Sequence, residues 1–248
     1  MMISILTVAY NSELTIRRTI ESVLKQTYSN IEYIIIDGLS EDNTVKIAES
    51  YKREFEKKGF RYQIVSETDK GMYDALNKGA NLCNGELVGQ INSDDWYEPN
   101  AVEIMADLYK KTHYDVAWGS IKINYRYGCI IKHAKIGRFW TTTNWCHPGM
   151  FSKREILLEF PYALESMYDD FDFITAVKCA GRKIVTTDDV ISNFTFGEGG
   201  KSTGSGLEEA IKRIRITYHI YRKYGMSRFY LFHRCFLESF KFIMGLRM

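Results

Sequence analysis

Short apolar runs alternate with helical repeats along the first 112 residues. The apolar runs occupy residues 3–8, 33–37, 62–67 and 87–91. Runs of this length are typical of strands that are buried on both faces. After the first run, apolar residues recur at Ile16, Ile20 and Val23, and this spacing predicts a helix. Further helices are expected over residues 45–55, 72–82 and 100–112. Four strand–helix pairs in succession predict a mostly parallel, right-handed α/β sheet flanked by helices.

The alternation changes after residue 115. Residues 116–124 and 129–132 are expected to form two strands joined by a turn at Tyr127-Gly128. The aromatic segment 137–150 has no period, which predicts a loop that lines a site. The remaining expected elements are a helix at 170–180, short strands at 183–187 and 190–194, a flexible loop at 196–204, and two helices at about 208–224 and 227–246.

Length and composition indicate an ordinary globular protein of 248 residues, 45% of them hydrophobic and 26% charged. We expect one domain over residues 1–206, with a first half at 1–112 and a second at 113–206, followed by a helical extension at 207–248. Five cysteines without a CxxC pair predict neither a zinc site nor a disulfide framework. A reducing compartment, no signal peptide and no membrane span are expected, hence a cytoplasmic protein.

Charge is distributed unevenly along the chain. Residues 207–248 hold nine Lys or Arg against three acids, which is +6, and the formal total of +2 leaves −4 for residues 1–206. An acidic body argues against nucleic-acid binding, whereas a basic, aromatic C-terminus suggests contact with an anionic surface. On the last helix Arg234 and Glu238 lie on a narrow polar stripe beside a wide Phe-rich face. Such a face suits a membrane interface, and it equally suits packing on the domain or on a second subunit.

Polar residues gather directly after the four predicted strands. They are Tyr10 and Asn11, then Asp37, then Asp69 and Lys70, then Asn92, Ser93, Asp94 and Asp95. Each could be a helix cap or turn former, but parallel strands bring all four groups to one edge, where α/β folds bind ligands. Asp94 and Asp95 are hard oxygen donors without Cys or His nearby, which predicts Mg²⁺ or Mn²⁺. Such a cation is commonly shared with phosphate, so the edge suggests an enzyme that acts on a phosphorylated donor.

Asn77 belongs to a polar helix face in the segment between two of these groups. It shares that face with Asp74 and Lys78 at helical spacing. The face could simply be solvated, or Asn77 could contact the donor.

Four motifs in order resemble glycosyltransferase family 2. They are Thr7-Val8-Ala9-Tyr10-Asn11, the segment 36–44 (IDGLSEDNT), the segment 69–79 (DKGMYDALNKG) and Asn92-Ser93-Asp94-Asp95. The resemblance is continuous over about the first hundred residues, with weaker echoes to about residue 204. It implies a GT-A (Rossmann-like) fold, a nucleotide-sugar donor and inverting transfer.

The resemblance also implies roles for the donor residues. Thr7, Ala9, Tyr10 and Asn11 would border the base and ribose, Asp37 would hydrogen-bond the base, and Asp69 and Lys70 would lie along the nucleotide. Asn92-Ser93-Asp94 matches the family's DxD motif, so Asp94 would ligate the metal and Asn92 would offer the ribose a hydrogen bond with little charge. Asp95 would be a second ligand or would cap the turn.

An inverting transfer also needs a base on the acceptor side, because a carboxylate that takes the hydroxyl proton lowers the barrier. Asp170 in Asp170-Phe171-Asp172-Phe173 resembles the family's base motif, and Asp169 and Asp172 compete with it. Acids also favour any helix N-terminus electrostatically. His147 and Trp145 could line the acceptor site, as could Asp172, although a lone His is as often structural.

The resulting hypothesis is a metal-dependent inverting glycosyltransferase of the EC 2.4 class. It would move sugar from a nucleotide-diphosphate sugar, with UDP expected, to a glycan or lipid-linked acceptor in cell-surface polysaccharide biosynthesis. Peripheral contact of the C-terminal helices with the inner face of the membrane and a homodimer are open alternatives for that extension. The rivals are a nucleotidyltransferase, for which the Gly-rich basic loop after the first strand is missing, and a non-catalytic nucleotide-sugar-binding or scaffold domain.

Overall fold

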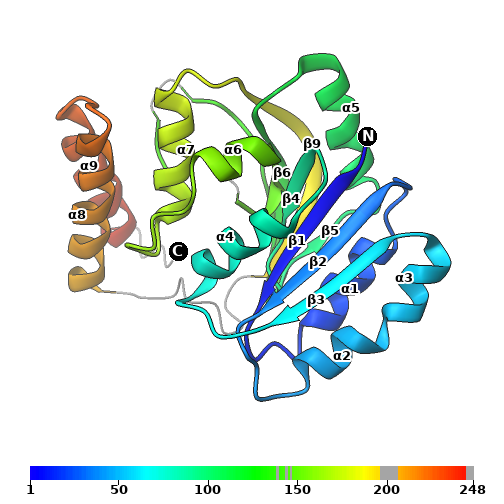
Figure 1. Cartoon of the computed structure of the whole chain (residues 1–248). Helices are drawn as coiled ribbons and strands as arrows, with labels where there is room; N and C mark the ends of the chain where they lie inside the picture. Colours follow the sequence, from blue (N-terminus) through cyan, green and yellow to red (C-terminus); the bar gives the residue numbers. More distant parts are fainter. Residues whose placement is uncertain (138–139, 143–144, 146, 196–205, 244–248) are drawn as a thin grey trace.

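The computed structural model describes residues 1–137, 140–142, 145, 147–195 and 206–243, with side chains as far as residue 239. The strands are β1 (Ile3–Ala9), β2 (Ile31–Asp37), β3 (Arg61–Ser66), β4 (Leu87–Gln90), β5 (Trp96–Tyr97), β6 (Val116–Tyr125), β7 (Gly128–Lys132), β8 (Met150–Lys153) and β9 (Ile184–Thr195). They form one nine-stranded sheet in the order β3-β2-β1-β4-β8-β6-β9-β5, with β7 paired to β6 (Figure 1).

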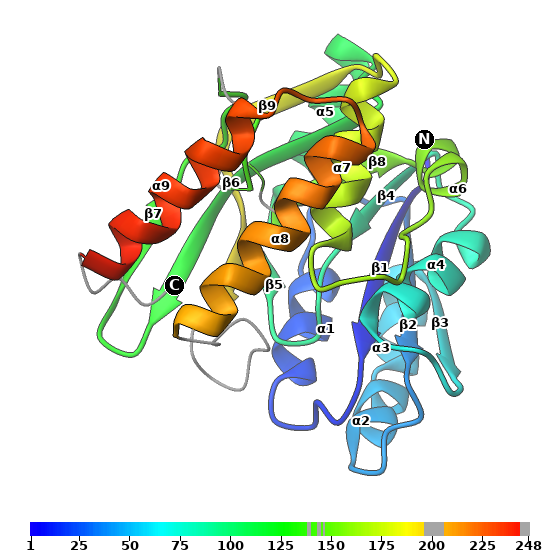
Figure 2. The same ribbon diagram turned by 90° about the vertical axis from the view of Figure 1, so that its left-hand side faces the viewer.

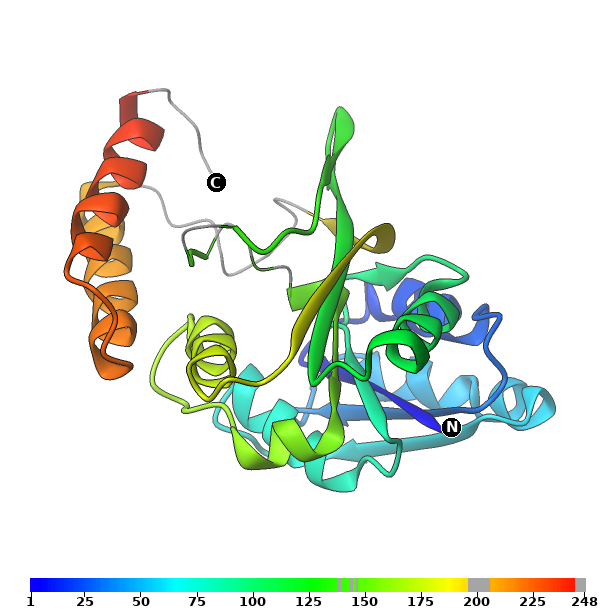
Figure 3. The ribbon, with the colours of Figure 1, turned by 90° about the horizontal axis from the view of Figure 1, so that it is seen from above.

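The first half of the sheet is parallel, as predicted. β1 pairs in parallel with β2 and with β4, and β2 pairs in parallel with β3. In this register Ala9 lies opposite Asp37, so the ends of β1 and β2 are level. The second half is mixed: β8 runs antiparallel to β4 and β6, whereas β9 runs parallel to β6. The β6–β7 hairpin projects from this half (Figure 3).

Helices cover both faces of the sheet. They are α1 (Ile16–Leu24), α2 (Thr44–Ser50), α3 (Lys52–Lys58), α4 (Met72–Leu82), α5 (Ala101–Thr112), α6 (Arg154–Glu159), α7 (Asp169–Cys179), α8 (Leu207–Lys223) and α9 (Phe229–Ile243), with a 3₁₀ turn η1 (His147–Gly149). One hydrophobic cluster joins the sheet to α1, α2, α3 and α5, and the other joins it to α4, α6, α7 and α8. The sheet is therefore the middle of three layers.

Several expected boundaries were wrong. The helix expected over 45–55 is divided at Tyr51 into α2 and α3. The two short strands expected at 183–187 and 190–194 are one strand, β9, with a register shift opposite Gly119 and Ser120. The loop expected over 137–150 ends at η1 and β8, and neither β8 nor α6 was expected. The loop expected at 196–204 lies outside the described residues.

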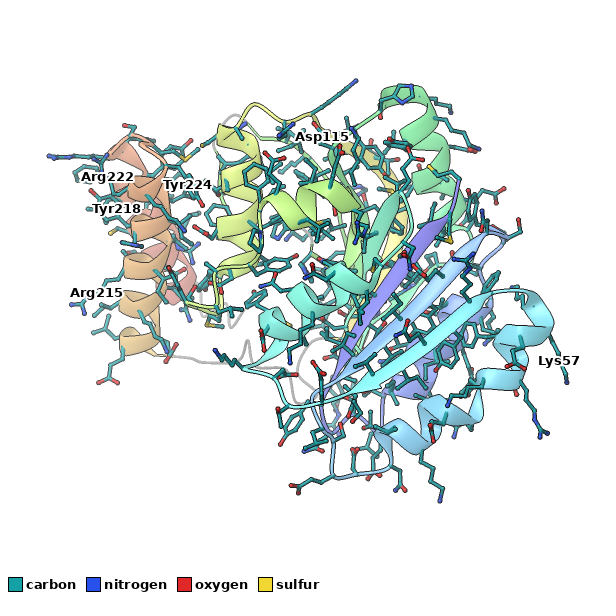
Figure 4. The ribbon with its side chains drawn as sticks, in the orientation of Figure 1. Lys57, Asp115, Arg215, Tyr218, Arg222 and Tyr224 are labelled. Carbon is teal, nitrogen blue, oxygen red and sulfur yellow. The ribbon has the colours of Figure 1, made fainter. Side chains whose placement is uncertain are left out.

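The last two helices form a hairpin on one side of the domain (Figures 2 and 3). Asp172 on α7 accepts hydrogen bonds from Lys223 Nζ at 2.9 Å and from the Tyr224 hydroxyl at 3.2 Å. Tyr224 lies between α8 and α7, whereas Arg215 and Arg222 point away from the domain (Figure 4). The hairpin thus shares a core with the second half of the domain, residues 113–206. No helix in the described ranges is long and apolar enough to cross a membrane.

The polar stripe of α9 faces inward. Glu238 is 5% exposed and pairs with Arg213 of α8 at 2.9 Å and with Arg234 at 2.8 Å. The opposite side of α9 carries Phe232 and Phe236, which are 71% and 67% exposed. This arrangement reverses the usual amphipathic pattern, in which the apolar side of a surface helix is buried.

Candidate active site

Loops at the ends of β1, β2, β3 and β4 meet at one edge of the sheet. The backbone N–H of Asn11 donates to Oγ of Ser40 at 2.8 Å, which joins the β1 and β2 loops. The hydroxyl oxygens of Ser12 and Ser93 lie 2.8 Å apart, which joins the β1 and β4 loops. Asn11 adopts a left-handed conformation (φ 48°), which asparagine tolerates better than most residues. The four groups predicted after the strands are therefore neighbours in space.

The β2 and β3 loops touch at Gly38. A Cβ on Gly38 would lie 2.6 Å from Oδ2 of Asp69 and 3.4 Å from a ring carbon of Tyr10. A larger residue at position 38 would force the Asp69 carboxylate to shift. The Tyr10 ring is 61% exposed, so an aromatic surface and a carboxylate stand together at the open edge.

Asp37 is buried and held rigidly. Its Oδ2 accepts hydrogen bonds from Ser40 N–H at 2.9 Å and from Ser66 Oγ at 2.7 Å, and its Oδ1 accepts one from Ser40 Oγ at 2.5 Å. Ser66 is the last residue of β3, so the orientation of Asp37 depends on two neighbouring strand ends. A carboxylate fixed in this way is prepared for directional hydrogen bonding to a ligand.

The other expected donor residues differ in how they can contribute. Thr7 is fully buried and its Oγ1 accepts a hydrogen bond from Tyr33, and Ala9 is buried as well. Because both side chains are buried, Thr7 and Ala9 support the loops at this edge of the sheet and offer little surface to a ligand. Lys70 is exposed at its rim.

Asn77 faces Tyr162 in the second half of the domain. Its Nδ2 donates to the carbonyl of Tyr162 at 2.9 Å, and its Oδ1 accepts the N–H of Tyr162 at 2.9 Å. Because both ends of the amide are engaged, the expected contact of Asn77 with the donor finds no support. Asn77 instead fixes Tyr162 against α4.

Asp95 is a buried acid whose two carboxylate oxygens have no hydrogen-bond partner among the described residues. Burial, and then the negative charge of Asp94, hold its pKa well above the ordinary value, opposed by the backbone of Thr195 and by Arg18. Burial likewise raises the pKa of Asp94. Within the described ranges, no three His, Cys, Asp or Glu side chains gather closely enough to hold a metal ion by themselves.

Arg18 secures the loop that carries these acids. Its guanidinium stacks 3.7 Å from the Trp96 ring centroid and donates to the carbonyl of Asp94 at 2.9 Å. It also donates to Oγ1 of Thr195 at 3.0 Å, at the end of β9.

The Oδ1 atom of Asn92 is buried without a hydrogen-bond partner in the described part of the chain.

Asp170 stands in an aromatic environment at the start of α7. Its Oδ2 accepts the indole N–H of Trp145 at 3.0 Å, and the hydroxyl of Tyr73 on α4 lies 3.3 Å from its Oδ1. The Tyr73 ring packs 5.1 Å from that of Tyr162. Burial and the charge of Asp170 raise the pKa of Tyr73 well above its usual value, so Tyr73 stays protonated and acts as a donor.

The two competing acids have structural partners. Asp169 accepts hydrogen bonds from the N–H groups of Glu165 and Ser166, at 2.9 and 2.8 Å, and so closes the turn before α7. Oδ2 of Asp172 accepts hydrogen bonds from Lys223 and Tyr224 of the C-terminal hairpin, whereas its Oδ1 is buried without a hydrogen-bond partner among the described residues. The bonded oxygen gives Asp172 a structural role in holding the hairpin, and its contact with the acceptor stays a prediction.

His147 lies near Asp170 in the buried turn η1. Its Nε2 has no hydrogen-bond partner among the described residues, and its ring lies 6.4 Å from Trp145 and 6.5 Å from Tyr162. Burial lowers the pKa of His147, opposed by the charge of Asp170. The imidazole is therefore neutral at pH 7.

Sequence reasoning missed the residues that hold the acids in place: Tyr73, Ser40, Ser66 and Arg18. Ser40 and Tyr73 lie inside the family motifs. Ser40 comes three residues after Asp37 and Tyr73 four residues after Asp69, and this spacing is the signal that could have indicated them. The contacts of Ser66 and Arg18 depend on pairing between distant segments, which no local pattern reveals.

The parallel strand ends, the acids beside them and the second, mixed half of the sheet define a GT-A glycosyltransferase fold. Residues 4–158 match the family "Glycosyl transferase family 2", and the chain belongs to this family. It is 36% identical to chondroitin synthase of Escherichia coli over 110 residues, which cover 44% of this chain and 16% of that protein. The matched part is thus about a sixth of that relative.

Solved structures share the fold. TarS 1–349 of S. aureus in complex with UDP-GlcNAc superposes with a TM-score of 0.69 at 19% identity, covering 93% of this chain and 69% of that chain. The mannosyltransferase PcManGT of Pyrobaculum calidifontis, in complex with GDP-Man and Mn²⁺, gives 0.64 at 17% identity, covering 89% and 63%.

Proposed function

We propose that this glycosyltransferase moves a sugar, with inversion, from a nucleoside-diphosphate sugar to an acceptor hydroxyl, with Asp170 as the general base. One observation carries the proposal. Among three acids in one helical turn, Asp169 and Oδ2 of Asp172 are engaged in structural contacts. Within the described part of the chain, Asp170 is instead bonded by the aromatic residues Trp145 and Tyr73 and by its own turn.

The donor is proposed to be a UDP-sugar bound along the four loops. Tyr10 offers an exposed ring on which a base can stack, and Asp37 a fixed carboxylate for its edge. Asp69 and Lys70 would follow along the nucleotide. The UDP-GlcNAc complex of TarS supports a UDP donor, and the GDP-Man complex of PcManGT keeps guanine as the alternative.

The residues at the end of β4 fit a divalent cation. Asp95 has two buried oxygens without described partners, and burial and the charge of Asp94 disfavour its ionised form more than Arg18 and the backbone of Thr195 favour it. Asp94 adds a second carboxylate with a raised pKa. Hard oxygen ligands of this kind suit Mn²⁺ or Mg²⁺. A cation bound there would neutralise charge on the departing diphosphate. The Mn²⁺ in the PcManGT complex supports this assignment.

In the proposed reaction the oxygen of the acceptor hydroxyl attacks the anomeric carbon of the donor sugar, and the proton of that hydroxyl passes to Asp170. The bond from that carbon to the diphosphate breaks, and the diphosphate leaves with the electron pair. Trp145 and Tyr73 orient the Asp170 carboxylate. Neutral His147 offers a nitrogen to an acceptor hydroxyl, and the surrounding rings exclude water.

The acceptor is proposed to be a glycan or a lipid-linked sugar of a cell-surface polysaccharide, reached from the inner face of the membrane. The Phe-rich side of α9 and the exposed basic side of α8, with Lys212, Arg215 and Arg222, favour an anionic lipid surface. Chondroitin synthase among the relatives is in keeping with a polysaccharide product.

Release of nucleoside diphosphate from UDP-GlcNAc, other UDP-sugars and GDP-mannose, with Mn²⁺ or with EDTA, tests the proposal. We expect turnover with a UDP-sugar and Mn²⁺, and loss of turnover in EDTA. Release of pyrophosphate from a nucleoside triphosphate and a sugar phosphate would instead identify a nucleotidyltransferase. Binding of a donor without turnover, even with added polysaccharide or lipid-linked acceptors, would favour a scaffold.

A further inference from the structure

The hydroxyl of Tyr73 has two acceptors and one hydrogen. It lies 3.1 Å from the carbonyl oxygen of Met167 and 3.3 Å from Oδ1 of Asp170. A phenol can donate to only one of them at a time. Both acceptors belong to the segment that opens α7, whereas Tyr73 belongs to α4.

We propose that Tyr73 is a positioning residue that switches its hydrogen bond from Asp170 to Met167 as Asp170 takes the acceptor proton. The inference rests on the proposed role of Asp170 as base. While Asp170 is ionised, its oxygen is the stronger acceptor and Tyr73 donates to it. Once the carboxylate is protonated, the Met167 carbonyl becomes the better partner. The proton of Tyr73 stays on Tyr73 throughout.

The helix α4 is well placed to transmit donor binding to this switch. It begins directly after the turn that carries Asp69, whose Oδ1 accepts the N–H of Gly71 at 2.7 Å. Tyr73 and Asn77 are four residues apart and share one side of α4, and they hold Asp170 and Tyr162. A donor that settles on the Asp69 turn therefore acts on the same helix that orients the base.

Other ionisable groups act on Asp170 from the elements around it. They are His147 of η1, Tyr162 before α7, and Tyr168 and Asp169 at its start. His147 is neutral at pH 7. Tyr73, Tyr162 and Tyr168 remain protonated, because burial raises the pKa of each of them. Among the described side chains, Tyr73 and Trp145 are the ones that donate directly to the Asp170 carboxylate.

The test compares Tyr73→Phe with Tyr62→Phe, which also loses a hydroxyl bonded to a backbone carbonyl, that of Ala48 at 2.8 Å, remote from Asp170. The probe is nucleoside diphosphate release from UDP-GlcNAc or GDP-mannose, whichever is turned over, as a function of pH. We expect Tyr73→Phe to lower kcat about tenfold and to move the acid limb of the kcat profile up by about one pH unit, because the ionised carboxylate loses a donor. The KM for the donor should change less than twofold, and Tyr62→Phe should leave the profile unchanged.

Trp145→Phe removes the donor to the other oxygen and should move the acid limb in the same direction. If Tyr73→Phe keeps the wild-type pH profile while Asp170→Asn loses turnover, the proposed switch is wrong, whereas Asp170 is still supported as the general base. If Asp170→Asn keeps full turnover, the base assignment fails and the switch fails with it. A Tyr73→Phe protein that loses activity equally at every pH would also overturn the switch, because packing alone would account for it.

Discussion

Trp145 donates its indole N–H to Oδ2 of Asp170 across 3.0 Å, which joins the segment before β8 to the first turn of α7. The indole is itself fixed, since its ring stacks edge-on against Trp118 at 5.1 Å. A carboxylate held in this way cannot rotate freely, so in the proposed reaction the acceptor would approach it from the remaining side. This contact with Trp145 distinguishes Asp170 from its acidic neighbours Asp169 and Asp172.

Asp170→Asn and Asp172→Asn should affect different properties. We expect Asp170→Asn to reduce turnover by about 10²–10⁴-fold with little change in Tm, because an amide cannot take the proton. Asp172→Asn should lower Tm, because it weakens the contact with Lys223. Turnover assays and thermal unfolding of both variants check this. Equal losses of turnover in the two would contradict the assignment.

The donor edge could be anticipated from sequence because its groups directly follow buried strands. Ile34 and Leu6 are fully buried between two helical layers, so each parallel strand appears as an apolar run and its end is visible. β8 offered no such signal. It has four residues and gains its pairing from β4 and β6, which are distant in sequence.

The choice among the acids near Asp170 could not be made from sequence. All three lie in one helical turn, and their difference comes from partners elsewhere in the chain. Tyr73 reaches Asp170 across 97 residues and Lys223 reaches Asp172 across 51. Only the tertiary fold decides which carboxylate is engaged by the C-terminal hairpin.

Asp95→Asn should stabilise the metal-free protein and remove its response to metal. In EDTA the variant no longer buries a carboxylate without a partner, so its Tm should exceed that of the wild type. Mn²⁺ should raise the Tm of the wild type and have little effect on Asp95→Asn. Asp188→Asn, at an exposed position, is the matched control. Equal Mn²⁺ responses in wild type and Asp95→Asn would place the cation elsewhere.

The stability of the metal-free protein should depend on pH through Asp95. Burial, then Asp94, raises the pKa of Asp95 in the folded state, so the folded state binds this proton more tightly than the unfolded chain, whose Asp pKa is about 3.9. The free energy of unfolding should therefore fall as pH rises from that value to the raised one. Urea unfolding in EDTA across this window should show the advantage of Asp95→Asn growing with pH. An advantage that is constant with pH would refute this explanation.

Glu238→Ala should destabilise the C-terminal hairpin by roughly 3–5 kcal/mol, because it leaves the buried guanidinium of Arg234 and the half-buried one of Arg213 without their shared carboxylate. Glu238 contacts Arg213 on α8 and Arg234 on α9, so the loss should loosen both helices. Hydrogen exchange of α8 and α9 measures the effect. Glu208→Ala, at an exposed position of α8, is the control. Unchanged exchange in Glu238→Ala would mean that the ion pairs contribute little.

Flotation with lipid vesicles tests the outward face of α9. We expect binding to vesicles of phosphatidylcholine with phosphatidylglycerol and much weaker binding to phosphatidylcholine alone, because the exposed side of α8 is basic. Phe232→Ser should weaken binding about ten- to a hundredfold, since burying a phenyl ring contributes ~1.5–3 kcal/mol. Leu14→Ser, at a site that is 93% exposed in the first half of the domain, should leave vesicle binding unchanged. If Phe232→Ser instead changes the concentration dependence of the molecular mass and leaves flotation unaltered, the Phe-rich face is covered by a second copy of the chain.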